Sequence, residues 1–270
     1  MQALPQAAFF LLLEAAVGGT IALFWVHLRG EVPRGFTLFT GACLLVCGAL
    51  AIWLRSAFPA AVGSDVDAAA RLWLQAERIL AIAFVLLLAV YLLALRSKRA
   101  QRISSILGPL VPLVGLASVW GASLAAANGQ LFGFGEPLAV LAGTVALGSA
   151  LTGLSLGHWY LVSPTLSIRP LIGLTFMCLG AVVVQLVLLP VLLATAGSAA
   201  QTVLKDDLPF LGVRVVFGLV VPVIALVMTW RTARIRSLDS ATGLLYIVAA
   251  LILAGEIAAR TLFFLTGVAT

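Results

Sequence analysis

Charged residues are scarce in this chain of 270 residues. Asp, Glu, Lys and Arg together make up 10% of it, whereas hydrophobic residues make up 63%. Soluble globular domains carry about 25% charged residues, so this composition excludes a soluble domain and predicts a polytopic membrane protein. The net charge of +6 does not indicate nucleic-acid binding, because the basic residues lie in short clusters between apolar segments.

Metal-ligating side chains are also few. The three cysteines, Cys43, Cys47 and Cys178, lie inside apolar segments, and none forms a C-x-x-C pair. An iron–sulfur cluster needs four thiolates at short spacings, so we expect no cluster and no metal site in this chain. Small buried packing residues are the expected role of the cysteines, with a metal pair at Cys43 and Cys47 as the alternative. The uncharged start of the chain, residues 1–7, predicts no cleavable signal peptide.

Eight apolar segments are each close to the ~20 residues that a helix needs to cross the hydrocarbon. They cover residues 8–28, 36–54, 72–95, 106–127, 138–162, 171–196, 210–230 and 242–267. The predicted fold is an all-α membrane protein with eight transmembrane helices, forming a single integral membrane domain over 1–270. Two four-helix bundles are one arrangement that the chain allows. The connections are short, so we expect function to reside within the bilayer or on a partner docked at one face.

The loop charges predict the orientation of the helices. The loops after the first, third, fifth and seventh segments contain ten basic residues: Arg29, Arg34, Arg96, Lys98, Arg99, Arg102, Arg169, Arg231, Arg234 and Arg236. The other loops contain only Arg55, Arg71 and Lys205 and are rich in acidic residues, Asp65, Asp67, Glu136, Asp206 and Asp207. Basic loops stay in the cytoplasm, so both termini are predicted to lie outside, in the periplasm.

Ionisable residues inside the apolar segments are the strongest functional signal. Each costs roughly 2.5–3.5 kcal/mol near the bilayer centre by insertion scales, so such residues persist mainly where they pair or line a polar site. At a rise of about 1.5 Å per residue, all of them fall in the outer half of the membrane or at its inner limit. They are Glu14, Glu77, Arg78, Arg214, Glu256 and Arg260, with Gln75 beside the third-segment pair. The i,i+4 spacing of Glu256 and Arg260 places them on one helix face.

Two interpretations of these charges stay open at this point. The first is a network of ion pairs that locks the helices together. The second is a polar pocket on the outer side, which accepts protons or binds the polar headgroup of a membrane-soluble ligand. Structural bundles use small residues, serine and threonine for helix packing at lower cost, and this chain already has them, which favours the pocket.

The two histidines offer a different chemistry. His27 and His158 are predicted to lie near the cytoplasmic ends of two segments, and two histidines at matched depth can ligate a b-type haem. The alternative is that both are interfacial side chains, because Trp25, Trp159 and Tyr160 lie beside them. The surrounding stretch 157–164, Gly-His-Trp-Tyr-Leu-Val-Ser-Pro, has no assigned role.

Three stretches resemble a known family. Residues 251–264 read Leu-Ile-Leu-Ala-Gly-Glu-Ile-Ala-Ala-Arg-Thr-Leu-Phe-Phe, residues 75–79 read Gln-Ala-Glu-Arg-Ile, and residues 213–222 read Val-Arg-Val-Val-Phe-Gly-Leu-Val-Val-Pro. They are similar to the last helix, the Asn-Glu-Ile segment and the Trp-Arg opening of the membrane anchor subunit family of bacterial dimethyl sulfoxide reductase. This family belongs to the wider polysulfide-reductase and formate-dependent nitrite-reductase anchor group. The last two helices carry the match, and the first half of the chain matches loosely.

The resemblance implies a function and roles for particular residues. Family members have eight helices with both termini outside. Glu77 and Arg214 match family positions tied to quinol oxidation, and Glu256 with Arg260 matches the terminal motif. The family's His-Leu-Gly-x-Pro after the second helix is absent here, where residues 53–59 read Trp-Leu-Arg-Ser-Ala-Phe-Pro, and Ala259 replaces a glycine. Either Arg55 or a carboxylate takes the role of that histidine, or quinol chemistry at that site is lost.

Together these observations predict a membrane anchor subunit of a respiratory oxidoreductase in the bacterial inner membrane. It is expected to be either a non-catalytic or a quinol-oxidising subunit, with menaquinone or ubiquinone bound in the outer half. Glu77 and Glu256 would accept protons, and Glu14, Gln75, Arg78, Arg214 and Arg260 would bind the quinone. The expected partners are membrane lipid, a periplasmic iron–sulfur subunit and, through it, a molybdopterin-type catalytic subunit. The alternatives are a transporter or flippase for a small anionic or lipid-headgroup substrate, and a haem carrier using His27 and His158.

Overall fold

The computed structural model describes residues 3–59, 68–97, 101–126 and 135–268. Helices joined by short turns make up these ranges, in which no strand occurs. The elements are α1 (Ala3–Arg29), α2 (Arg34–Ala57), α3 (Ala68–Arg96), α4 (Gln101–Ala126), α5 (Gly135–Val162), α6 (Arg169–Thr195), α7 (Ser198–Lys205), α8 (Leu208–Gly212), the π-helix η2 (Val213–Val220), α9 (Val221–Arg234) and α10 (Leu238–Thr266). The loop charges at Asp65, Asp67, Lys98 and Arg99 lie outside the described residues, and so does residue 127, the predicted end of the fourth segment.

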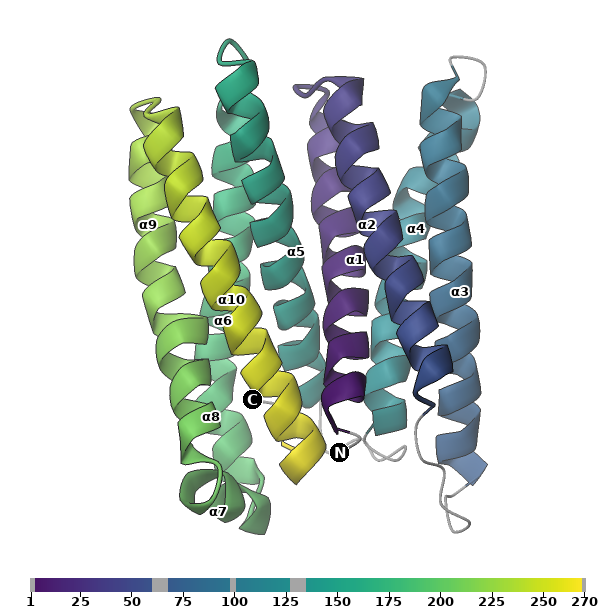
Figure 1. The fold of residues 1–270 in the computed structure, drawn as a ribbon, viewed down its shortest axis with the longest axis vertical. Coiled ribbons are helices and arrows are strands. Elements are labelled where there is room, and N and C mark those ends of the chain that lie inside the picture. Colours follow the sequence, from purple (N-terminus) through teal and green to yellow (C-terminus); the bar gives the residue numbers. More distant parts are fainter. Residues whose placement is uncertain (1–2, 60–67, 98–100, 127–134, 269–270) are drawn as a thin grey trace.

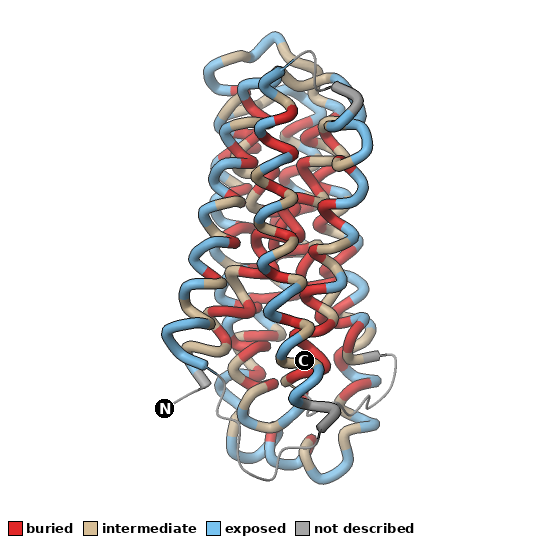
Figure 2. Tube along the Cα trace, turned by 90° about the vertical axis from the view of Figure 1, so that its right-hand side faces the viewer, coloured by how far each residue is buried: buried red, intermediate tan, exposed pale blue. Residues whose placement is uncertain are grey.

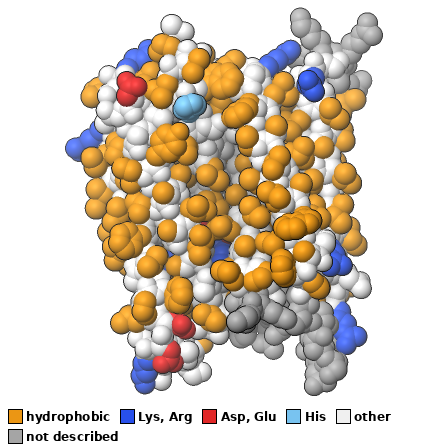
Figure 3. Space-filling view, in the orientation of Figure 1, with side chains coloured by type: hydrophobic (Ala, Val, Ile, Leu, Met, Phe, Trp, Pro, Cys, Tyr) orange, Lys and Arg blue, Asp and Glu red, His pale blue; other side chains and the backbone are white. Residues whose placement is uncertain are grey.

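Eight helices are long and apolar enough to cross a membrane, with α8, η2 and α9 together forming the seventh span. This confirms the predicted all-α, eight-helix membrane fold. Hydrophobic side chains cover the middle of the surface in Figure 3, and charged side chains lie mostly toward its two ends. Most helices extend a few residues beyond the predicted apolar segments, because they continue into the interface with polar residues such as Arg34 and Arg96.

The helices form two groups of four spans. Helices α2, α3 and α4 pack mainly on one another and on α1, and α5, α6, α10 and the α8–η2–α9 span pack mainly on one another. Helix α1 joins the groups through its contacts with α5 and α10. The two termini of the chain lie at the same end of the bundle, which is drawn at the bottom of Figure 1. We call it the termini end. The connections α1–α2, α5–α6 and α9–α10 lie at the opposite end, and so do the last turn of α3 and the first turn of α4.

Helices α1 and α5 form the centre of the molecule. In their most apolar 18-residue windows, 72% and 67% of the residues are buried, against 33–50% for the other spans. Figure 2 shows buried residues running along the interior for almost the full height of the bundle. The lipid-facing sides of the outer helices remain exposed and apolar, as expected for helices that meet acyl chains.

Two glycines bring α1 and α5 into backbone contact. A Cβ on Gly148 would overlap the backbone of Gly18, and a Cβ on Gly18 would overlap the carbonyl group of Thr144. Small residues at such a crossing let helix backbones approach closely where lipid offers no hydrophobic drive. The two helix groups are therefore held together by a tight, rigid contact.

Adding a methyl group at this crossing is expected to separate the two groups. Gly148→Ala should destabilise the protein by at least about 1–3 kcal/mol, the usual cost of overpacking, because backbone atoms cannot move aside as a side chain can. The thermal unfolding midpoint in detergent measures this. Gly243→Ala on α10 is the matched control, since nothing lies within 4 Å of its Cβ. Equal midpoints for the two variants would contradict the described contact.

The seventh span changes its helical type. Pro222, near the start of α9, has no N–H to donate to the carbonyl of Gly218, and the preceding turns form the π-helix η2. Gly218 lies against α10, where its Cβ would be 2.6 Å from the Cα of Gly255. This close approach places the buried Arg214 of η2 beside Glu256 of α10. π-Helical turns inside α-helices often occur at functional sites.

The stretch 157–164 fastens the loop between α5 and α6. The hydroxyl group of Tyr160 donates a hydrogen bond to the carbonyl of Ser167. Arg236 donates from Nη2 to the carbonyl of Leu166 at 2.8 Å. The Trp159 ring packs edge-on against Phe36 of α2, with centroids 6.0 Å apart. These contacts give this stretch a structural role that its sequence did not reveal.

Candidate functional site

A cavity of about 390 Å³ opens between α2 and α3 near the termini end. It is lined by Phe9, Ile52, Arg55, Ser56, Glu77, Arg78, Ala81 and Ile82, and we call it the Glu77 groove. Its volume falls within the ~300–1,000 Å³ of typical small-molecule sites. One part of the lining is charged and the rest is apolar, so the groove suits an amphipathic ligand.

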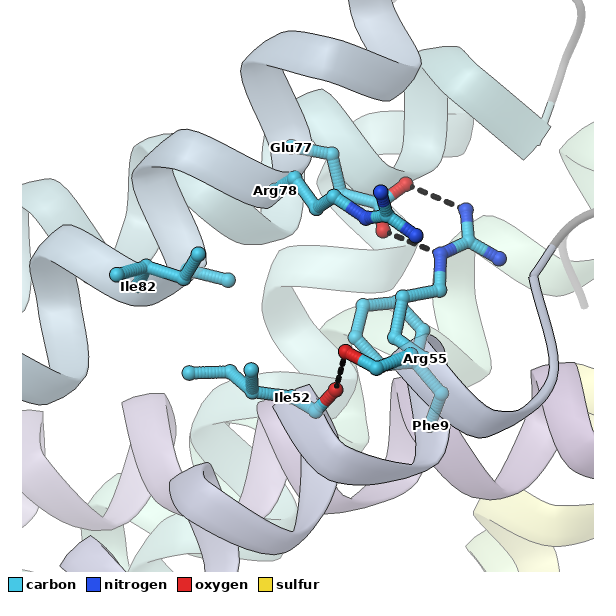
Figure 4. A pocket seen from close by; sticks show the side chains of 8 residues that line it. Phe9, Ile52, Arg55, Glu77, Arg78 and Ile82 are labelled. Atoms are coloured by element: carbon cyan, nitrogen blue, oxygen red, sulfur yellow. Dashed lines mark hydrogen bonds and ion pairs between the residues drawn. The ribbon is translucent and has the colours of Figure 1, made fainter.

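An ion pair between neighbouring helices forms the polar part of the groove. Arg55 of α2 donates from Nε and Nη2 to the two carboxylate oxygens of Glu77 on α3, both at 2.8 Å, as Figure 4 shows. The side chain of Glu77 is 1% exposed and that of Arg55 is 11% exposed. The Arg55 guanidinium also lies over the ring of Phe9 on α1, 5.0 Å from its centroid. Such bidentate pairs are geometrically specific, so three helices hold the Glu77 carboxylate in one position.

The other polar residues of this region differ in their placement. Arg78 follows Glu77 on α3 and lines the groove from its exposed side. Gln75 is exposed and is not among the groove residues. Arg55, which the sequence placed in a loop, is part of α2 because that helix continues to Ala57.

A second polar group lies in the interior of the other half. It consists of Glu14 on α1, Gln185 on α6, Arg214 on η2, and Glu256 and Arg260 on α10, and we call it the Glu256 cluster. All five side chains are at most 3% exposed. Two carboxylates face two guanidinium groups, so the cluster is neutral when all four are ionised.

Arg260 stands at the centre of this cluster. Its Nε and Nη2 atoms lie 3.0 and 2.8 Å from the two carboxylate oxygens of Glu14. Its Nη2 also donates to Glu256 Oε2 at 3.1 Å, which confirms the predicted i,i+4 pair. The other Glu256 oxygen accepts hydrogen bonds from Arg214 Nη1 at 3.0 Å and from Gln185 Nε2 at 2.8 Å.

Arg214 uses only part of its hydrogen-bonding capacity. Its Nε and Nη2 atoms are buried and have no hydrogen-bond partner among the residues that the structure describes, and the same holds for Gln185 Oε1. Arg55 and Arg260 use these same two nitrogen atoms to hold a carboxylate. Arg214 thus contacts Glu256 through one nitrogen atom, whereas Arg55 and Arg260 each hold a carboxylate through two.

Gly143 of α5 lies against the Glu256 cluster, where any side chain would collide with it. A Cβ at this position would lie 2.7 Å from Glu256 Oε2, 2.9 Å from Arg260 Nη2 and 2.9 Å from Gln185 Nε2. Gly143→Ala is expected to destabilise the protein by about 1–3 kcal/mol through overpacking, as measured by its unfolding midpoint in detergent. Gly180→Ala on α6, with nothing within 4 Å of its Cβ, should be neutral or stabilising, because alanine is the better helix former. A neutral Gly143→Ala would contradict this packing.

Two adjacent phenylalanines connect the two polar regions. Phe9 lies under Arg55 of the groove, and Phe10 lies 5.7 Å from the guanidinium of Arg260. The two rings are perpendicular, with centroids 6.0 Å apart. Helix α1 thus contacts a guanidinium group of each region through consecutive side chains.

The structure divides the predicted site residues into two groups. Glu77 and Arg78 belong to the groove, whereas Glu14, Arg214, Glu256 and Arg260 form a separate, enclosed cluster. From the sequence, Arg55 was only one alternative for the role of the family's histidine, and Gln185 had no site role. A glutamine within the apolar run 171–196 is costly in a bilayer, and this was the signal that could have identified Gln185.

The two histidines are not brought together in the interior. His27 is half-buried, with its ring edge-on to Tyr91 at 6.3 Å, whereas His158 is exposed on α5. Among the described residues, no group of three or more His, Cys, Asp and Glu side chains is arranged to hold a metal ion. Cys178 is buried as expected, but Cys43 is exposed on α2, so the expectation of burial is wrong for Cys43.

No protein-family model matches the chain, and no curated protein matches its sequence. The resemblance to the anchor subunit family therefore rests on the motif residues in the third, seventh and eighth spans.

Proposed function

We propose that this protein is the membrane anchor subunit of a respiratory oxidoreductase and binds a quinone at the Glu77 groove. The observation that carries the proposal is the buried Glu77 carboxylate, held by Arg55 at the wall of a cavity of about 390 Å³. With the orientation that the loop charges predict, this groove would lie in the outer half of a bacterial inner membrane. An electron-accepting iron–sulfur partner would then dock on the periplasmic face and pass electrons to a molybdopterin-type subunit.

The groove residues fit a quinone headgroup chemically. A quinone is a flat ring with two oxygen atoms, and the groove combines apolar walls at Ile52 and Ile82 with charged groups at Arg55, Glu77 and Arg78. Oxidation of a quinol to a quinone releases two electrons, which the iron–sulfur partner would accept, and two protons. Glu77 would accept one proton from a hydroxyl group in the groove, since a positioned carboxylate is an effective general base, and the second proton would pass to water at the outer face.

Arg55 and Arg78 would act as positioning groups in this reaction. Arg55 fixes the Glu77 carboxylate through two hydrogen bonds, and its packing on Phe9 limits its own movement. Arg78 extends the positive charge to the exposed side of the groove, where it can orient a ligand oxygen. Arg55 stands in the segment where the resembled family has its histidine, which supports the first of the alternatives drawn from the sequence.

The Glu256 cluster has a different role in this proposal. Its ion pairs connect α1, η2 and α10, and the hydrogen bond from Gln185 adds α6. Neither described cavity includes these residues. We therefore assign Glu14, Arg214, Glu256 and Arg260 to holding the fold around the groove. The backbone contact between Gly18 and Gly148 favours a fixed scaffold over the rocking motion that alternating-access transport requires.

Co-purification tests the proposal. The tagged chain is isolated from its native membranes in mild detergent, and the associated proteins are identified by mass spectrometry. We expect a partner with iron–sulfur cysteine spacings, and quinol-dependent reduction of its clusters in the isolated complex. A chain that repeatedly emerges intact and alone, and that moves a solute when placed in liposomes, would contradict the anchor function and support transport.

A further inference from the structure

A second cavity lies between α2 and α3, toward the end opposite the termini. Its volume is about 580 Å³, and its lining is apolar apart from one arginine. Leu38, Ala42 and Leu45 of α2 face Ala89, Leu92 and Arg96 of α3. We call it the Arg96 groove. On each helix these positions are spaced three or four residues apart, so each set forms one face of its helix.

Small residues create the space in this groove. Ala42 and Ala89 present only methyl groups, and Gly41 lets the Leu92 side chain lie directly against α2, where a Cβ would overlap it. From Ala89 to Arg96 the groove extends about 10 Å along α3. The Arg96 groove is therefore an apolar groove that runs along α2 and α3 from the end of the bundle toward its middle.

This groove is separate from the Glu77 groove. Between the two, Gly48 of α2 lies against Val85 of α3, where a Cβ on Gly48 would be 2.8 Å from Val85 Cγ2. This contact closes the space between α2 and α3 at the level of Gly48. A ligand with its headgroup at Glu77 thus has no enclosed path to the Arg96 groove, and the two cavities need different occupants.

Positive charge marks the mouth of the Arg96 groove. Arg96 is exposed at the end of α3, and Arg34 is exposed at the start of α2, one helical turn before Leu38. Neither arginine forms an ion pair with a residue that the structure describes. Arg96 lines the groove and Arg34 lies one turn before Leu38 on the same helix face. Two guanidinium groups without an ion pair among the described residues match an anionic headgroup attached to a hydrocarbon chain.

We propose that the Arg96 groove binds one anionic phospholipid, with its phosphate at Arg96 and Arg34 and the upper part of an acyl chain between α2 and α3. Basic pockets between transmembrane helices on the cytoplasmic side are typical sites for anionic headgroups. The groove is lined by two rows of apolar side chains with an arginine at one end, and this arrangement matches one hydrocarbon chain that carries an anionic headgroup. The lipid would fill the gap that α2 and α3 leave beside their contact at Gly48.

Lipid retention by the purified protein tests this proposal. The protein is equilibrated in detergent with phosphatidylglycerol or phosphatidylcholine of the same acyl chains, and the bound lipid is counted by native mass spectrometry. We expect one phosphatidylglycerol to be retained about tenfold better than phosphatidylcholine, given two basic residues at the mouth. Arg96→Gln should remove most of this preference, and Ala42→Phe should lower retention of both lipids by filling the groove from its exposed side.

Arg231→Gln is the matched control, because Arg231 is also exposed, at the same end but on α9 in the other helix group. It should retain the lipid as the unchanged protein does, and all variants should keep the same unfolding midpoint without added lipid. Equal retention of the two lipids by the unchanged protein would overturn the proposal. It would also be overturned if Arg231→Gln lost the preference as Arg96→Gln does, or if a co-purified protein segment occupied the groove.

Discussion

Glu77→Gln is expected to lower quinol-linked electron transfer by about 100-fold or more while leaving the protein folded. A glutamine has nearly the same shape as the glutamate, and it can still accept a hydrogen bond from Arg55. It cannot take a proton, and a positioned general base contributes typically 10²–10⁴-fold to a rate. The measurement is the rate at which the complex, in membranes or mild detergent, is reduced by a soluble quinol analogue.

Glu136→Gln is the control variant. It shows whether the loss of activity is specific to Glu77 or follows from removing any carboxylate at the termini end. Glu136 lies in the first turn of α5 and is not a residue of the Glu77 groove, so its variant should retain full activity. Glu77→Asp keeps the acid but shortens the side chain, and should recover part of the rate. Unchanged turnover in Glu77→Gln would remove Glu77 from the mechanism.

Arg260→Met is expected to cost the most stability of any single change in the molecule. The substitution removes the partner of Glu14 and one partner of Glu256, both of which are fully buried. Breaking one buried ion pair typically costs about 3–5 kcal/mol, because an uncompensated charge remains in a low-dielectric interior. We expect little folded protein in detergent, measured as the monodisperse fraction on size-exclusion chromatography after a heating series.

A double variant distinguishes uncompensated charge from lost packing. Glu14→Gln combined with Arg260→Met removes one charge of each sign, so the double variant should be more stable than Arg260→Met alone. Arg231→Met, at an exposed arginine outside the cluster, should leave the unfolding midpoint nearly unchanged. If Glu14→Gln further destabilised Arg260→Met, the charge-balance explanation would fail.

The helices were predictable because each apolar run is long enough to span a bilayer and has few competing interpretations. Their ends were less predictable, since a helix continues into the interface after its apolar residues end. Arg55 illustrates the consequence. The apolar run ends at residue 54, so the sequence placed Arg55 in a loop, whereas α2 continues to Ala57 and brings Arg55 to Glu77.

The position of a charge on its own helix was accessible from sequence, but its lateral position in the bundle was not. The rise per residue gives the height of each charged group along its helix, and the i,i+4 spacing correctly paired Glu256 with Arg260 on one helix face. Neither says which helices are neighbours. Glu77 and Glu256 lie on helices of different groups, so charges that seemed to form one pocket belong to two separate regions.

Two short elements escaped prediction, one because it lacks an apolar run and one because it lies inside a longer one. Helix α7 has only eight residues and a polar exposed face, with Ala200 and Val203 buried, so it carries no membrane signal. The π-helix η2 has the same apolar composition as an ordinary span, and only Pro222 indicates a change in its hydrogen bonding. Yet η2 carries Arg214, so the Glu256 cluster depends on a feature that hydropathy does not show.

Photoaffinity labelling with an azido-quinone tests the central claim most directly. The probe is activated on the complex in native membranes, and labelled peptides are located by mass spectrometry. We predict labels at residues 52–56 of α2 and 78–82 of α3, both of which line the Glu77 groove, and their loss when excess unmodified quinone competes. Labelling confined to other helices, or labelling of these peptides that excess quinone does not reduce, would contradict a quinone site at Glu77.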